Sequence, residues 1–177
     1  PVETPWVETP EAPDATALPQ PLFDDAAVGN HGWGFMEDGC QSVVVTDEEV
    51  YEGEKAIMAK WSTSETKPCS LMVFGINWSD WNPVDVTEMK EQAELHFYIK
   101  AADPTALDFR IELEDFNRAS SGVDWSTSYA KQAKDGWWAV NIPMAKLVEN
   151  IDMKQVKSLL FRMQGEGEMY LDELRWE

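Results

Sequence analysis

Hydrophobic side chains occupy every second position in three segments of the chain, Leu95–Ile99, Phe109–Leu113 and Leu159–Met163. A period of two is the period of a β-strand, in which successive side chains point to opposite faces of a sheet. One face of each strand therefore packs on a core, and the other faces water. The polar and amphipathic positions that we expect to face outward are His96, Tyr98, Arg110, Glu112, Arg162 and Gln164.

Shorter apolar runs, separated by turn sequences, predict more strands. These are Gln41–Thr46, Ala56–Trp61, Ser70–Ile76, Trp137–Ile142 and Met169–Trp176. Turn signals such as Glu52-Gly53-Glu54 and Asp135-Gly136 lie between them. Only short helical segments are expected, such as Pro143–Glu149. Many short strands without intervening helices predict an all-β fold, a β-sandwich jelly roll of two packed antiparallel sheets.

Residues 1–21 differ from the rest in composition and predict a Pro/Glu/Thr-rich linker. Val2–Pro5 repeats as Val7–Pro10, and Pro13, Pro19 and Pro21 follow. Proline at this density favours a stiff, extended conformation. We therefore expect one domain over residues 22–177, tethered to a larger parent, and the start at Pro1 favours an excised module or a processed product.

The charge excludes two classes of partner. The chain carries 33 acidic and 14 basic residues, for a net charge of -19. Binding to nucleic acids or to anionic membranes needs clustered Lys and Arg, and the sequence has no such cluster. Acidity of this kind serves solubility, or attracts a cationic partner.

Nine tryptophans accompany this charge, and three of them lie in polar, turn-rich sequence. Trp78, Trp81 and Trp125 are the rings for which burial in a core is hardest to argue, although Trp81 could also cap the edge of the core. Trp33, Trp61, Trp137 and Trp176 lie in apolar surroundings and are expected in the core. Trp138 alternates out of phase with Trp137 and is expected to face solvent or ligand. Exposed rings on an acidic β-sheet protein favour a neutral ligand with apolar faces and many hydroxyls, such as a sugar chain.

Cys40 and Cys69 have no further Cys or His at metal-binding spacing. In an exported protein they would form one disulfide, and the alternative is a pair of free buried thiols. Carboxylates are abundant, but nothing selects a catalytic pair, and no nucleophile elbow, zinc-protease motif or phosphate loop occurs. The sequence thus predicts no catalytic residues. Asn77-Trp78-Ser79 matches the glycosylation sequon, which we interpret as chance.

Several phrases resemble one family in order and spacing. The opening Leu22-Phe23-Asp24-Asp25, the strand entry Tyr51–Ile57, the phrase Gly136–Pro143 and the closing strand Tyr170–Trp176 resemble galactose-binding-like jelly rolls. The set is most similar to family 11 carbohydrate-binding modules and to related C-terminal modules of glucan hydrolases, over residues 22–177. This chain offers mainly tryptophan and Tyr98 where that family favours tyrosines, which leaves its exact ligand open.

The resemblance implies a non-catalytic module that binds a polysaccharide, with β-glucan favoured, across a concave sheet. The strand positions expected on that sheet as ligand contacts are Tyr98, His96, Arg110, Glu112, Arg162 and Gln164. The local sequence adds Trp78, Trp81, Trp125 and Trp138 as candidate contacts. The resemblance also implies a structural Ca²⁺ held by Asp24 or Asp25 and by Asp172, with backbone carbonyls near Gly53 and Lys55. It further implies a monomer, tethered to the catalytic domain of a secreted bacterial enzyme.

Two alternatives stay open. The domain could be a structural accessory that packs on a catalytic neighbour without binding sugar, in which case the loop tryptophans would be buried at that interface. It could instead be a small jelly-roll hydrolase or lyase, which would need a deep cleft with clustered acid–base residues.

Overall fold

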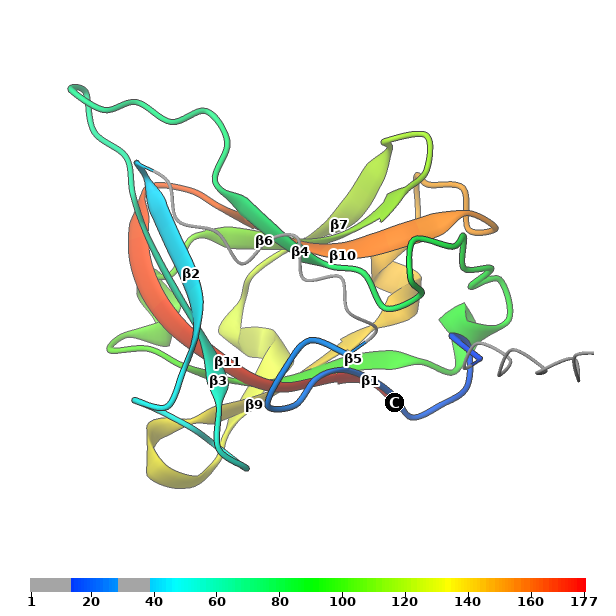
Figure 1. Cartoon of the computed structure of the whole chain (residues 1–177), viewed down its shortest axis with the longest axis horizontal. Helices are drawn as coiled ribbons and strands as arrows, with labels where there is room; N and C mark the ends of the chain where they lie inside the picture. The colour runs from blue at the N-terminus through cyan, green and yellow to red at the C-terminus, as the bar shows by residue number, and fades with distance from the viewer. Residues whose placement is uncertain (1–13, 29–38) are drawn as a thin grey trace, which may run out of the picture.

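A computed structural model describes residues 14–28 and 39–177, and they form a sandwich of two antiparallel sheets (Figure 1). The larger sheet has the order β2-β3-β11-β5-β9-β8, with β1 paired to β11, and the smaller sheet has the order β4-β10-β6-β7. The strands of the larger sheet are β1 (Gln20–Phe23), β2 (Gln41–Thr46), β3 (Ala56–Ser62), β5 (Glu94–Lys100), β8 (Ala130–Gln132), β9 (Trp138–Pro143) and β11 (Glu166–Trp176). Those of the smaller sheet are β4 (Val73–Ile76), β6 (Phe109–Asp115), β7 (Ser120–Asp124) and β10 (Val156–Met163). The predicted all-β sandwich is confirmed.

Helical structure in the described residues is limited to 3₁₀ turns. They are η1 (Met89–Glu91), η2 (Pro104–Ala106), η3 (Thr127–Tyr129), η4 (Lys134–Gly136) and η5 (Met144–Leu147). The last of these occupies most of the segment for which a short helix was predicted. Among the described residues, no helix has the length and apolar character needed to cross a membrane.

The core lies between the two sheets and is filled by the inward members of the alternating segments. Phe97 of β5 and Phe161 of β10 meet there at a ring-centroid distance of 5.8 Å, and Phe74 of β4 stacks on Phe161 at 4.8 Å. Leu95, Phe97 and Ile99 are fully buried. Because the inner faces of both sheets meet in this core, their outer faces look in opposite directions.

The folded unit begins earlier than the sequence predicted. β1 starts at Gln20 and pairs with the end of β11, with Gln20 opposite Trp176. Ahead of it, the carbonyl of Ala15 accepts a hydrogen bond from the Trp78 indole at 3.2 Å. The predicted linker boundary at residue 21 is therefore too late, because residues 14–21 already contact the domain. Trp33 and the repeat within residues 1–13 lie outside the described residues.

Candidate functional site

The outward-facing residues predicted to form one surface lie on two opposite surfaces. Arg110, Glu112 and Arg162 are on the outer face of the four-stranded sheet, whereas His96 and Tyr98 are on the outer face of the larger sheet. The expectation of one shared face is wrong. Alternation within each strand shows which positions face outward, but not which sheet the strand joins.

The outer face of the four-stranded sheet is organised around Glu112, whose side chain is 8% exposed. Arg110 donates from Nε to Glu112 Oε1 at 3.1 Å, and Arg162 donates from Nη2 to Glu112 Oε2 at 3.2 Å. The register places Arg162 opposite Arg110 across β10 and β6. The side chains of Arg110 and Arg162 are 34% and 31% exposed, so an external ligand reaches the arginines but not the carboxylate that holds them.

A third strand completes this cluster. Arg110 also donates from Nη1 to Asp124 Oδ1 at 2.7 Å and from Nη2 to the carbonyl of Gly122 at 3.2 Å, both on β7. The hydrogen bond to Asp124, more than the one to Glu112, raises the pKa of Arg110, so the guanidinium stays charged. Asp124 was missed because β7, with the sequence Ser-Ser-Gly-Val-Asp, shows no clear alternation of apolar residues.

Gly122 lies opposite Glu112 on the neighbouring strand β7 and places no side chain beside it. A Cβ at this position would lie 1.9 Å from the backbone oxygen of Ile111, so a larger residue would force β6 and β7 apart. The planar guanidinium groups of Arg110 and Arg162 are the partly exposed hydrogen-bond donors of this face. Such groups are suited to directional hydrogen bonds with hydroxyl oxygens.

Trp81 lies in the loop that leaves β4 at Ile76 and rejoins the start of β10 through the Val84–Val156 bridge. It is 42% exposed, and both Asp80 (φ 55°) and Trp81 (φ 63°) have left-handed backbone conformations. These conformations cost non-glycine residues about 1 kcal/mol each. Two such residues in succession indicate a loop whose surroundings impose its backbone path.

Trp78 and Trp125, the favoured ligand rings, are buried, and the prediction that they are exposed is wrong. Trp78 is 4% exposed, packs near Trp176 and donates its indole N–H to Ala15. Trp125 is 9% exposed, stacks on Phe109 at 5.3 Å and donates to the carbonyl of Pro104 at 2.8 Å. Each indole N–H donates to a backbone carbonyl, so burial of the ring leaves no unpaired polar atom. The rings are therefore buried although the residues that flank them in sequence are polar.

Trp137 lies just before β9 and Trp138 is its first residue, and neither is an open ligand-binding ring. Trp138 pairs with Ile99 and packs, partly buried, against the core, so the prediction that it faces solvent or ligand is wrong. Trp137 is 2% exposed, but it is buried beside Tyr51, with ring centroids 5.9 Å apart. Gln164, just after β10, is exposed, and its backbone carbonyl accepts the indole N–H of Trp61 at 2.9 Å.

Tyr98 and His96 are covered by neighbouring side chains. Tyr51 stacks on Tyr98 at 3.6 Å with an interplanar angle of 13°, and Lys134 lies over Tyr51. His96 is 7% exposed, and its Nδ1 is 2.8 Å from Asn141 Oδ1. Burial, more than the hydrogen bond with Tyr51, raises the pKa of Tyr98. These rings fasten the 47–55 loop to the sheet, and they do not form an open platform.

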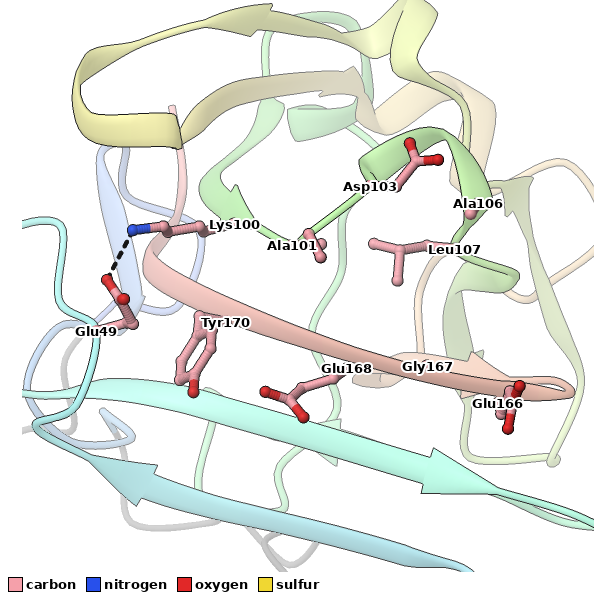
Figure 2. A pocket seen from close by; sticks show the side chains of 11 residues that line it. Glu49, Lys100, Ala101, Asp103, Ala106, Leu107, Glu166, Gly167, Glu168 and Tyr170 are labelled. Carbon is pink, nitrogen blue, oxygen red and sulfur yellow. Dashed lines mark hydrogen bonds and ion pairs between the residues drawn. The ribbon is translucent and has the colours of Figure 1, made fainter.

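A groove of about 610 Å³ lies on this same outer face, along β11 and beside the segment that follows β5 (Figure 2). Ala101, Ala106 and Leu107 form an apolar side, and Tyr170 lies across from them. Its charged residues are Glu49, Lys100, Asp103, Glu166 and Glu168, with Lys100 bound to Glu49 at 2.7 Å. The groove is therefore acidic, and its one cation is already paired.

The residues implied for calcium do come together, but not as a set of oxygen ligands. Asp25 Oδ1 accepts the backbone N–H groups of Glu54 and Lys55 at 2.7 and 2.8 Å. Asp172, fully buried, accepts those of Tyr51 and Glu52 through Oδ2 at 2.8 and 3.1 Å. Gly53 (φ 75°) lets the turn wrap this closely, since a Cβ there would lie 2.5 Å from Asp25 Oδ1.

The turn thus presents N–H donors to both carboxylates, whereas calcium needs six to eight oxygens, carbonyls among them. Asp24 uses Oδ1 locally, accepting the N–H of Ala26 at 3.3 Å. Within residues 14–28 and 39–177, no three His, Cys, Asp or Glu side chains converge as a metal site. This donor set does not fit the implied ion, and calcium stays a prediction of the resemblance. We name the observed arrangement of Asp25, Asp172 and residues 51–55 the carboxylate latch.

Cys40 and Cys69 are joined in a disulfide that spans 29 positions of the sequence. It links the segment just before β2 to the segment before β4, and therefore ties one strand of each sheet together.

Comparison with known proteins places this chain in a family. The family model described as carbohydrate binding domain 30 matches residues 21–177. Among curated proteins, none matches the sequence. The family 30 carbohydrate-binding module of the cellulosomal cellulase Cel9D-Cel44B of Clostridium thermocellum superposes with a TM-score of 0.70 at 20% identity, covering 91% of this chain and 98% of that one.

A second solved family 30 module gives a TM-score of 0.68 at 21% identity, over 91% of this chain and 99% of its own. The family 11 module from Clostridium thermocellum, solved with a β-1,3-1,4-mixed-linked tetrasaccharide, gives 0.50 at 13% identity, over 89% of this chain and 94% of that one. These similarities show the shared sandwich fold, and they confirm the resemblance to carbohydrate-binding jelly rolls. Since the family model spans nearly the whole described domain, the chain belongs to family 30 of the carbohydrate-binding modules, which are non-catalytic sugar-binding domains.

Proposed function

We propose that this module binds a β-glucan across the outer face of the four-stranded sheet, with Arg110 and Arg162 at its centre and Trp81 at its end. The observation that carries the proposal is the guanidinium pair, held in place by the nearly inaccessible Glu112 and left partly open to solvent. An aromatic ring packs on the C–H face of a pyranose, and fixed planar donors bind its hydroxyls.

Charge and spacing support a neutral, extended ligand. A net charge of -19 repels polyanionic polysaccharides, whereas a glucan carries no charge to repel. Arg162 pairs with Val73 at one end of β4, and the loop of Trp81 leaves the other end of β4 at Ile76, about 10 Å away at the usual rise of a strand. A single sugar ring does not cover such a span, so contact with both Arg162 and Trp81 requires a chain.

The module would act by proximity, holding a tethered polysaccharide-degrading enzyme near its substrate. We infer a modest affinity, micromolar or weaker, because a flat surface buries limited area. The Cys40–Cys69 disulfide supports secretion, because disulfides persist in oxidising compartments.

Native affinity electrophoresis tests the proposal, with gels that contain mixed-linkage β-glucan, xyloglucan, xylan, galactomannan or laminarin. We expect retardation in a β-glucan gel, weakened at least tenfold by Trp81→Ala and by Arg162→Ala. Tyr170→Ala is the matched control, since it removes an aromatic ring from the opposite sheet, and it should bind as the unmodified chain does.

Two results would overturn the proposal in different ways. Unchanged mobility in every gel would favour a structural accessory domain. Loss of binding in the Tyr170 variant, with binding intact in the Trp81 and Arg162 variants, would move the site to the groove of the larger sheet.

A further inference from the structure

The loop that carries Trp81 is built around one buried amide, that of Asn77. Asn77 is fully buried, and its Oδ1 accepts backbone N–H groups from Ser79 at 3.0 Å and from Trp81 at 3.3 Å. The Ser79 hydroxyl oxygen lies 3.4 Å from the same Oδ1. A single side-chain oxygen therefore takes the backbone donors of the second and fourth residues after it.

The far end of the loop is closed by Asn82. Its backbone N–H and its Nδ2 both donate to the carbonyl of Ser79, at 3.1 and 3.0 Å, and the Ser79 hydroxyl donates back to the carbonyl of Asn82. These bonds join residues 79 and 82 to each other. Asn77 joins that turn to the end of β4, and so fixes the turn relative to the sheet.

We propose that Asn77 is the positioning residue for Trp81. Its Oδ1 holds Asp80 and Trp81 in their left-handed conformations, so that the ring stands exposed before a ligand arrives. The part of this inference that concerns affinity rests on the proposed function; the part that concerns the loop does not. A ring held in advance loses less conformational freedom on binding, which raises affinity.

The geometry specifies which half of the amide matters. Oδ1 accepts both backbone hydrogen bonds, whereas Nδ2 has no hydrogen-bond partner among the described residues. Aspartate retains the acceptor, serine retains an oxygen that reaches only the nearer N–H, and leucine retains the volume alone. The three variants therefore keep the hydrogen-bond acceptor of residue 77 fully, in part or not at all. Because its side chain is fully buried, Asn77 is also inaccessible to glycosylation in the folded chain, although it lies in a sequon.

Two measurements on the full chain test this role: affinity for mixed-linkage β-glucan, and amide hydrogen exchange of residues 77–83 by mass spectrometry. We expect Asn77→Leu to weaken affinity at least tenfold and to speed exchange in this loop at least tenfold, with exchange in β6 and β10 unchanged. Asn77→Asp should stay within threefold of the original chain in both measurements. Asn77→Ser should fall between them, and it carries the test if the leucine variant does not fold.

Original affinity and loop exchange in the Leu or Ser variant would overturn the inference. Equal losses in the Asp and Leu variants would also overturn it, because they would show that burial of the amide matters rather than its acceptor. If Trp81→Ala binds normally while Asn77→Leu still speeds loop exchange, the proposed binding site fails and the positioning of the loop stands.

Discussion

Trp78 and Trp81 are three positions apart in one loop, yet one is buried and the other is 42% exposed. Hydropathy does not separate them, because both are flanked by polar residues. Their surroundings do: the Trp78 indole reaches the carbonyl of Ala15, whereas the backbone N–H of Trp81 is held by Asn77. At the residue scale, hydrogen-bond partners distant in sequence therefore decide which ring can meet a ligand.

Glu112 offers a prediction at the same scale. Glu112→Gln keeps the shape but removes the charge that two guanidinium groups share, and hydrogen bonds to charged groups are each worth about 1.5–3 kcal/mol. We expect the free energy of unfolding, measured in urea, to fall by about 2–3 kcal/mol. Asp124→Asn is the control, because Asp124 binds the same arginine, Arg110, but its side chain is 80% exposed. We expect its free energy of unfolding to fall by less than about 0.5 kcal/mol. Equal losses would show that burial of Glu112 adds nothing.

At the scale of elements, the carboxylate latch connects the segment after β1, the turn before β3 and the middle of β11. Its two acids differ in environment. Burial, outweighing the backbone hydrogen bonds, raises the pKa of Asp172, whereas hydrogen bonds from Glu54 and Lys55 lower the pKa of Asp25. Burial, followed by the charge of Asp172, also raises the pKa of the neighbouring Glu173.

These directions predict opposite pH dependences for the two acids. Folded Asp172 keeps its proton at a pH where the unfolded chain has lost it, so its contribution to stability falls as pH rises from 3.8 to its folded pKa. The contribution of Asp25 is present above 3.8 and is lost as pH falls through its lowered folded pKa. Urea unfolding between pH 3 and 7 should show the stability difference from Asp172→Asn shrinking with rising pH, and that from Asp25→Asn growing. The same slope for both variants would contradict the assignment.

At the scale of the whole molecule, the net charge of -19 makes the fold repel itself. The Debye length shortens from about 30 Å at 0.01 M salt to about 8 Å at 0.15 M. We expect the melting temperature, measured by calorimetry, to rise by several degrees over that range in NaCl. The affinity for β-glucan should change less than twofold, because the ligand is neutral. An affinity that changes tenfold would indicate a charged ligand and count against the proposed one.

Much of the fold can be predicted from the sequence, because apolar and polar residues alternate along a half-buried strand. Gln41–Thr46 coincides with β2, and Leu95, Phe97 and Ile99 are buried as their alternation predicts. β7 and β8 were missed, since their short polar sequences carry no such period. The predicted Ser70–Ile76 strand is paired only from Val73.

The site itself depended on tertiary structure. The sequence determined that Arg110, Glu112 and Arg162 face outward, because alternation is a local property of the strand. Only the pairing of β10 with β6 placed these three together, and only the opposition of the two sheets separated them from His96 and Tyr98. The burial of Trp78 and Trp125 likewise required the carbonyls of Ala15 and Pro104, which lie 63 and 21 positions away. Composition and periodicity describe residues that are close in sequence. Hydrogen-bond partners such as Ala15 and Pro104 come close to the tryptophans only when the chain folds.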